Sequence, residues 1–306
     1  MNYKRIAILG AGAIGSYFIY GLEQKDDIDY CVIADGDRLQ RLNKDGIIIN
    51  NQRYAPKVIP SDKARGADLL IVAVKYNALK TVLDDIATIA DDHTVILCPM
   101  NGIDKEQIIG DAVGEEKLVY SLIKVISERK DNQIHFDPVT SVGVIYGEKD
   151  GRISARVTAL DNLFEGTDIH YRSTDVILSE IWTKFYLNVG NNLIQAIVGC
   201  GMGSYEKSGH MRYLQQKLRE EVMQIAKVKG IGFSDVASSL KPSAMRPTDR
   251  FSTLQDLDAH RHTEIDMFSG AIVRLGKELG IPTPYNDMTY HLIKSLEEKN
   301  DGDFDF

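Results

Sequence analysis

The chain has 306 residues, of which 43% are apolar and 26% charged, so it is long enough for two domains and a sizeable core. Its net charge of −8 argues against broad attraction to nucleic acid or to an anionic membrane. No apolar run approaches the roughly 18 residues that cross a bilayer, and no basic leader precedes an N-terminal apolar segment. We therefore expect a cytoplasmic protein.

The chain opens with an apolar run at residues 6–9, which predicts a strand buried on both faces. A Gly-x-Gly-x-x-Gly loop follows, made of Gly10, Ala11, Gly12, Ala13, Ile14 and Gly15. In such a loop the first glycine permits a tight turn, the second lets backbone approach a pyrophosphate, and the third lets the next helix pack closely. That helix is expected over residues 16–23, with the backbone N–H groups at its start facing the phosphates.

A second apolar strand, residues 30–34, ends at Asp35, which lies twenty residues beyond Gly15. At that spacing an acidic side chain meets the ribose of an adenosine. Strand, glycines, helix, strand and acid in this order predict a dinucleotide site, and the alternative is an ordinary strand–helix turn.

As far as residue 150, short apolar runs alternate with helical ones, which is typical of a parallel sheet. The expected strands cover residues 46–49, 55–59, 67–75, 94–98, 118–126 and 142–147. Residues 150–176 are polar and broken, and the rest of the chain has helical patterns. We predict an α/β fold: a Rossmann-like doubly wound domain over residues 1–176, then an all-helical domain over residues 177–306.

Two polar positions follow predicted strands. Lys75 ends one strand, and Asn101 with Gly102 follows the next. Ligands of open α/β sheets lie outside the carboxyl ends of the strands, so both positions fall on the cofactor side. The alternatives are a solvated lysine and a turn that needs positive φ.

The first helix of the second half, predicted over residues 176–198, is apolar around most of its surface. Lys184, Asn188 and Asn192 recur every four residues and form one polar stripe on it. Buried polar groups left unpaired cost roughly 1–3 kcal/mol each, so either internal groups or a small polar ligand must pair with them. A lysine partly removed from water has a lowered pKa, which makes Lys184 a candidate general acid.

Glu264 precedes Phe268 by four residues and Ile272 by eight, so a helix there would place it on the apolar face. An acid in that position is either used or paired, and the alternative is a cap near the helix N-terminus. No His, Cys or acidic cluster has metal-ligand spacing, so no metal site is predicted.

Taken together, these stretches resemble the ketopantoate reductase (2-dehydropantoate 2-reductase) family. The resemblance spans residues 10–266, nearly the whole chain, and the lysine–asparagine helix and the Thr-Glu-Ile-Asp segment are its specific parts. Its motifs are Gly10 to Gly15, Lys75, Asn101-Gly102, Trp182-Thr183-Lys184 with Asn188 and Asn192, Ser252 before Leu254-Gln255-Asp256, and Thr263-Glu264-Ile265-Asp266.

The resemblance implies reduction of ketopantoate at its 2-oxo group, in pantothenate and coenzyme A biosynthesis. Lys184 would protonate the substrate oxygen as hydride arrives, and Glu264 would hold the substrate hydroxyl and orient Lys184. Lys75 would lie near nicotinamide and substrate. The side chains implied to position the substrate's polar groups are Asn101, Asn188, Asn192 and Ser252, and Asn101 also borders the cofactor.

The sequence departs from the family pattern at two positions. Met202 stands where the family often has a substrate-binding asparagine. Asp35 stands where the family usually has an arginine for the 2′-phosphate of NADPH, and a carboxylate suits a free ribose instead. Arg38, three residues later, could still contact a phosphate. NADP(H) is therefore implied by the resemblance, and NAD(H) by the local chemistry.

Two further hypotheses stay open: a reductase of another 2-oxo acid on the same fold, and a regulator that senses dinucleotide without chemistry. Retention of Lys184 and Glu264 counts against the regulator, because a sensor needs no acid beside a nicotinamide. An apolar face in the helical half is compatible with a homodimer.

Overall fold

The computed structural model describes residues 1–130, 133–234 and 246–304. The chain divides into two compact units, Met1–Ile177 and Leu178–Phe306. Within the described ranges, no helix combines the length and the apolar character needed to cross a membrane.

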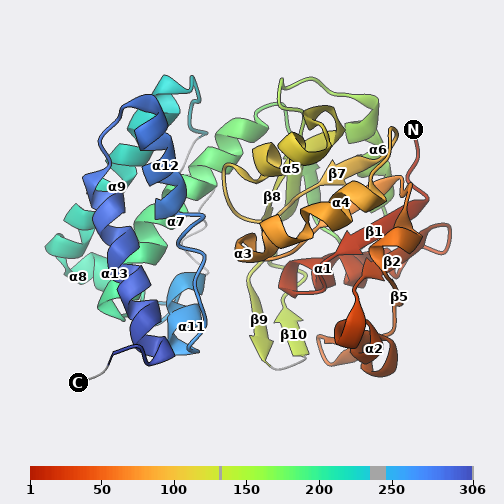
Figure 1. Cartoon of the computed structure of the whole chain (residues 1–306), viewed down its shortest axis with the longest axis horizontal. Helices are drawn as coiled ribbons and strands as arrows, with labels where there is room; N and C mark the ends of the chain where they lie inside the picture. Colours follow the sequence, from red (N-terminus) through yellow and green to blue (C-terminus); the bar gives the residue numbers. More distant parts are fainter. Residues whose placement is uncertain (131–132, 235–245, 305–306) are drawn as a thin grey trace. The chain divides into compact units, whose positions relative to one another are not determined.

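The first unit is built on a sheet with the strand order β12-β11-β8-β7-β6-β1-β2-β5 (Figure 1). Six neighbouring strands, β5, β2, β1, β6, β7 and β8, run parallel to one another. Strand β11 is antiparallel to β8. The strands are β1 Arg5–Leu9, β2 Asp29–Ile33, β5 Lys57–Ile59, β6 Leu69–Val72, β7 Val95–Leu97, β8 Leu118–Lys124, β11 Gly143–Gly147 and β12 Tyr171–Ser173. The predicted α/β class is confirmed.

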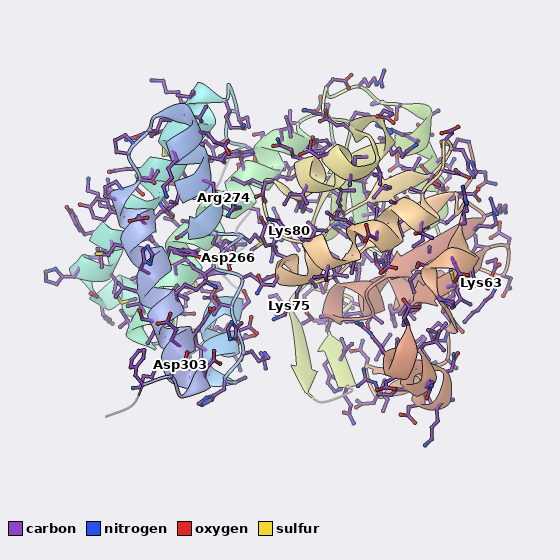
Figure 2. The ribbon with its side chains drawn as sticks, viewed as in Figure 1. Lys63, Lys75, Lys80, Asp266, Arg274 and Asp303 are labelled. Carbon is purple, nitrogen blue, oxygen red and sulfur yellow. The ribbon has the colours of Figure 1, made fainter. Side chains whose placement is uncertain are left out.

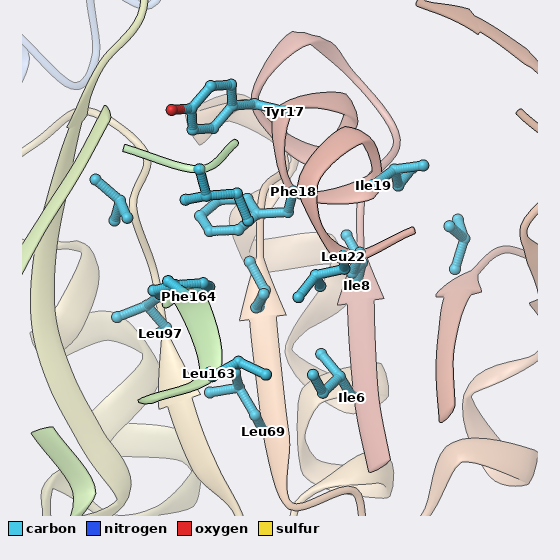
Figure 3. Close-up of a cluster of buried hydrophobic side chains, with 14 of the residues drawn as sticks. Ile6, Ile8, Tyr17, Phe18, Ile19, Leu22, Leu69, Leu97, Leu163 and Phe164 are labelled. Carbon is cyan, nitrogen blue, oxygen red and sulfur yellow. The ribbon is translucent and has the colours of Figure 1, made fainter. Parts of the chain in front are cut away.

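Helices of the first unit connect these strands. They are α1 Ala13–Leu22, α2 Gly36–Asp45, α3 Tyr76–Leu79, α4 Leu83–Ile89, α5 Lys105–Val113 and α6 Ala155–Phe164. Phe18 and Leu22 of α1 and Phe164 of α6 pack with Ile8 of β1 and Leu69 of β6 in one buried cluster (Figure 3). Fully burying such a side chain contributes about 1.5–3 kcal/mol, so this cluster holds α1 and α6 against the sheet.

Helix α1 begins at Ala13, three residues before the predicted start. Gly12 is its N-cap with extended backbone, and the Ser16 N–H donates to the Gly12 carbonyl at 2.8 Å. The glycine loop and the first helical turn therefore overlap, because the loop's last residues already have helical geometry.

A second, smaller sheet has the order β4-β3-β10-β9. Its strands are β3 Ile47–Ile49, β4 Gln52–Tyr54, β9 Ser127–Lys130 and β10 Gln133–Phe136. The predicted strand at residues 46–49 thus leaves the main sheet and pairs with β10, which follows it by more than 80 residues in the chain. Sequence pattern alone does not show which strands pair, because pairing depends on partners distant in the chain.

The stretch at residues 150–176 is more regular than its polar texture suggests, since it contains α6 and β12. The Ser154 side chain caps α6 by accepting the Val157 N–H at 3.2 Å. Leu160 and Phe164 supply the buried face, so a few apolar residues suffice to dock this helix.

The described residues of the second unit form helices and turns, as predicted. The helices are α7 Ile177–Val198, α8 Ser204–Lys207, α9 Gly209–Val228, α11 Ser252–Asp258, α12 Ser269–Leu279 and α13 Pro284–Asp301. Helix α12 packs against α9 and α13, and α13 also contacts α9 and α11 (Figure 1).

Candidate functional site

The glycine loop has the geometry that a phosphate cradle requires. Gly10 adopts φ +104°, a value that L side chains rarely tolerate. A Cβ on Gly15 would lie 1.8 Å from the Gly10 carbonyl oxygen, so only glycine lets α1 pack this closely. A Cβ on Gly12 would meet no described atom within 4 Å, which leaves open space beside the loop. The first N–H groups of a helix have no intrahelical acceptor, so Ala13 and Ile14 present donors there.

A cavity of about 150 Å³ lies beside this loop. Asp35 is the exposed N-cap of α2, and two arginines of that helix, Arg38 and Arg41, line the cavity. The other lining residues are Ala11, Leu42, Gly46, Ile47 and Ile134. Arg38 was singled out from the sequence and Arg41 was not. The signal for Arg41 was its spacing of three residues, which places it on the same helix face.

Lys75 and Asn101 follow β6 and β7, which are neighbours in the sheet. Lys75 is the exposed N-cap of the short helix α3 (Figure 2), and Asn101 is half-buried. The Tyr76 hydroxyl donates to Asp104 Oδ2 at 2.8 Å and ties the two loops together. Gly102 takes φ +110°, so the turn interpretation accounts for that glycine, while the cofactor role of Asn101 stays a prediction.

Three residues after Gly102, the chain forms a buried ion pair between Lys105 and Glu106. Both side chains are almost fully buried, and the Lys105 ammonium also donates to the Ser121 carbonyl at 3.0 Å. Breaking one partner of such a pair is costly because it leaves an uncompensated buried charge. The pair therefore anchors the start of α5 and with it the Asn101 turn.

In the second unit, Lys184, Asn188 and Asn192 lie along α7 as one stripe. Lys184 and Asn188 are half-buried, and Asn192 is only 3% exposed. Among the described residues, Asn192 Oδ1 has no hydrogen-bond partner. A buried amide oxygen without a partner costs roughly 1–3 kcal/mol, so a ligand hydroxyl or N–H would be favoured here.

Glu264 does not lie on a helix, which corrects the sequence prediction. It starts a turn in which the Met267 and Phe268 N–H groups donate to its carbonyl, at 3.0 and 3.2 Å, and α12 begins only at Ser269. Phe268 is the N-cap of that helix, so the capping alternative for Glu264 fails as well.

Helix α13 holds this turn on both sides of Glu264. Glu297, 2% exposed, accepts the Thr263 N–H at 2.7 Å and the Thr263 hydroxyl at 2.6 Å. Beyond Glu264, the Asp266 carboxylate accepts from Tyr290 and from Lys294, each at 2.9 Å. These pairings join residues that are 24 to 34 positions apart, so no local pattern could have revealed them.

The Asp266 carbonyl also accepts from Arg274 at 3.2 Å, and Figure 2 shows both side chains. Burial raises the pKa of Asp266, but hydrogen bonds from Lys294 and Tyr290 outweigh burial and hold that pKa below its usual range. The turn is thus anchored through a charged carboxylate.

The Glu264 turn packs against α7 beside the candidate acid. The rings of Phe185 and Phe268 are 6.1 Å apart, centroid to centroid. Phe185 follows Lys184 directly, and Phe268 closes the turn that Glu264 opens. Lys184 and Glu264 therefore come from neighbouring segments of one unit. Their catalytic roles, like the substrate role of Ser252 at the exposed start of α11, stay predictions.

Within the described ranges, no group of three or more His, Cys, Asp or Glu side chains could hold a metal ion.

Comparison with known proteins gives the site its context. The family model "Ketopantoate reductase PanE/ApbA" matches residues 6–150, and its C-terminal counterpart matches residues 176–297. A 2-dehydropantoate 2-reductase from Archaeoglobus fulgidus is 27% identical over 97% of this chain and 99% of its own length.

Two solved structures show the same fold over nearly the whole chain. A ketopantoate reductase of the PanE/ApbA family from Ralstonia eutropha JMP134 has a TM-score of 0.83 at 22% identity, covering 97% of this chain and 99% of its own. D-mandelate dehydrogenase with NADH and anilino(oxo)acetate also has a TM-score of 0.83, at 25% identity and the same coverage. The family models together cover most of the sequence, and the chain belongs to the ketopantoate reductase PanE/ApbA family.

Proposed function

We propose that this chain reduces ketopantoate at its 2-oxo group to pantoate, with hydride from a nicotinamide cofactor, in pantothenate and coenzyme A biosynthesis. The observation that carries the proposal is the α7 stripe, in which the half-buried Lys184 shares one helix face with Asn192, whose amide oxygen has no partner among the described residues. A cation for a developing alkoxide and an acceptor for a hydroxyl suit a hydroxylated 2-oxo acid.

The reduced nicotinamide supplies the hydride when it is bound. Lys184 donates the proton to the carbonyl oxygen and stabilises the negative charge that develops there. Glu264 accepts the substrate hydroxyl and orients the Lys184 ammonium. Asn188, Asn192 and Ser252 hold the remaining polar groups, and Lys184 regains its proton from water. Carbonyl, hydride and proton thus balance to one secondary alcohol.

We propose NADPH as the preferred cofactor. The glycine loop accommodates a pyrophosphate, because the Gly12 position is open and the α1 N-terminus adjoins it. Arg38 and Arg41 line the adjacent cavity and bring two positive charges to it, whereas the carboxylates Asp35 and Asp37, at the start of the same helix, are not among its lining residues. Guanidinium groups bind phosphate oxygens through two parallel hydrogen bonds, so two arginines in the lining of the cavity favour a 2′-phosphate.

A second candidate is reduction of a different 2-oxo acid. Two observations favour it: Met202 replaces an expected asparagine, and the D-mandelate dehydrogenase relative holds NADH with an oxoacetate. An apolar methionine would suit a substrate with an apolar side chain in place of the hydroxyl.

Initial rates with purified protein separate the two candidates. We expect kcat/KM for ketopantoate to exceed that for phenylglyoxylate, the 2-oxo acid related to mandelate, at saturating NADPH. The reverse order would replace ketopantoate by an aryl 2-oxo acid as the proposed substrate.

We also propose a homodimer. Helices α7, α9 and α13 form an apolar groove whose rim includes Val198, Met288 and Leu292, exposed by 53%, 49% and 42%. Exposed apolar patches of this kind often mark protein interfaces. Sedimentation velocity over a range of concentrations tests this, and a monomer at every concentration would contradict it.

A further inference from the structure

Gln195 lies in the last turn of α7 and is fully buried. Its side-chain amide forms two hydrogen bonds with the backbone of a segment distant in the chain. Nε2 donates to the Asp249 carbonyl at 3.0 Å, and Oε1 accepts the Phe251 N–H at 2.7 Å. One buried amide satisfied at both ends by the same stretch of chain fixes the position and the direction of that stretch.

The gripped stretch, residues 247–251, also lies against the chain that follows α7. The Met202 N–H donates to the Asp249 carbonyl at 3.0 Å, and the Gly203 N–H donates to the Pro247 carbonyl at 2.9 Å. A Cβ on Gly201 would lie 2.4 Å from the Pro247 carbonyl oxygen. Glycine therefore permits this close approach, which holds residues 247–251 in one place.

The segment leads directly into Ser252, since Phe251 is the N-cap of α11 and Ser252 its first residue. Gln195 lies seven residues beyond Asn188, about 20° from it around the helix, so the two share a face of α7. One face of α7 thus carries the proposed substrate amides and the grip on the segment that carries Ser252.

We infer that Gln195 is a positioning residue that sets Ser252 in register with the Asn188–Asn192 face of α7. This inference rests on the proposed function. Gln195 acts on substrate binding rather than on proton transfer, because it lies eleven residues from Lys184, about 16 Å along the helix.

A double-mutant cycle on substrate KM tests this. Gln195→Leu removes both hydrogen bonds and keeps a similar volume, and we expect it to raise the KM for the 2-oxo acid about five- to tenfold. We expect kcat and the KM for NADPH to stay within about twofold of wild type. Ser252→Ala should raise the same KM. The double variant should raise it little further, because both changes remove the same interaction, the contact of Ser252 with the substrate.

Hydrogen exchange at the Phe251 amide supplies a readout that needs no substrate. The exchange rate should increase in Gln195→Leu and stay unchanged in the control Gln215→Leu. The control removes the 2.7 Å hydrogen bond that the Gln215 side-chain amide donates to Asn191, which also lies on α7. The control should leave the substrate KM unchanged as well.

An unchanged KM or an unchanged Phe251 exchange rate in folded Gln195→Leu overturns the inference, and so do KM effects that multiply in the double variant. Wild-type protein that fails to reduce ketopantoate overturns the proposed function instead. The same cycle is then measured with the 2-oxo acid that the wild type does reduce. The Phe251 exchange rate still tests whether Gln195 holds the segment before Ser252 in place.

Discussion

At the residue scale, two glycines of one loop separate the demands of the fold from those of the cofactor. A Cβ on Gly15 would clash with the Gly10 carbonyl, whereas a Cβ on Gly12 would enter open space. Packing of the helix therefore requires glycine at position 15. Packing does not require glycine at position 12, where the approach of a bound pyrophosphate would require it.

We expect Gly15→Ala to destabilise the cofactor-free protein by roughly 1–3 kcal/mol, because α1 must move away from the loop. Gly12→Ala should leave the melting temperature of the cofactor-free protein unchanged and weaken NADPH binding at least about tenfold, since its methyl group occupies the pyrophosphate's space. Thermal melts and fluorescence titration measure these effects. Undiminished NADPH binding by Gly12→Ala would place the cofactor elsewhere.

Lys184 is the residue on which the proposed chemistry depends. Lys184→Ala should lower kcat by about 10²–10⁴-fold, the usual contribution of a positioned acid, while the affinity for NADPH stays close to wild type. Lys227→Ala, at an exposed position on α9, is the control and should keep full activity. Turnover preserved in Lys184→Ala would rule out the mechanism.

In the proposed function, the choice between NADPH and NADH depends on two arginines of α2. Arg38→Ala and Arg41→Ala should each lower kcat/KM for NADPH by roughly tenfold to a hundredfold and leave kcat/KM for NADH nearly unchanged, because only NADPH carries the 2′-phosphate. Parallel assays with the two cofactors check this. Equal losses with both cofactors would mean that the arginines shape the cavity without reading the phosphate.

Gly12, Lys184 and Arg38 are candidates that the sequence alone singles out, and the sequence-based prediction of local structure was wrong where partners distant in the chain decide the geometry. The Glu264 helix is the clearest case: the apolar spacing favours a helix from residue 264, but Glu297 holds Thr263 from α13 and a turn forms instead. No local pattern marks Gln195 either, since the partners of its side chain lie 54 and 56 residues away.

At the scale of elements, α13 stabilises the Glu264 turn through side-chain hydrogen bonds. Burial lowers the pKa of Lys294, but its hydrogen bonds to Asp266 and Glu297 outweigh burial and raise it. The pKa of Asp266 is lowered in return. The pair therefore stabilises the protein above the ordinary carboxyl pKa, and this contribution is lost as the pH falls through the lowered pKa of Asp266.

We expect Lys294→Met to lower the free energy of unfolding by about 1 kcal/mol at neutral pH, a value that allows for the partial exposure of both side chains. The difference from wild type should begin to shrink as the pH falls below the ordinary Asp pKa of about 3.9, where the unfolded chain takes up a proton, and should vanish only below the lowered pKa of folded Asp266. Urea unfolding at the two pH values measures it.

The control is Lys299→Met, in the exposed last turn of the same helix, which should match wild type at both pH values. A Lys294→Met difference that stays constant with pH would show that packing of the side chain, not its charge, supports the turn.

At the scale of the whole molecule, the order of strands and helices was predictable because buried parallel strands read as unbroken apolar runs. The smaller sheet was not, since β3 and β10 pair across more than 80 residues of chain. Helix α6 was missed because its buried face rests on a few residues such as Leu160 and Phe164 within a polar stretch.

In the proposed reaction, hydride moves from the nicotinamide to the 2-oxo carbon of ketopantoate. The most direct measurement is product analysis by mass spectrometry after incubation with ketopantoate and NADPH deuterated at the transferred position of the nicotinamide C4. We expect pantoate with one deuterium at C2, formed by wild type and nearly absent with Lys184→Ala. Pantoate without deuterium, or no pantoate while NADPH still binds, would contradict it.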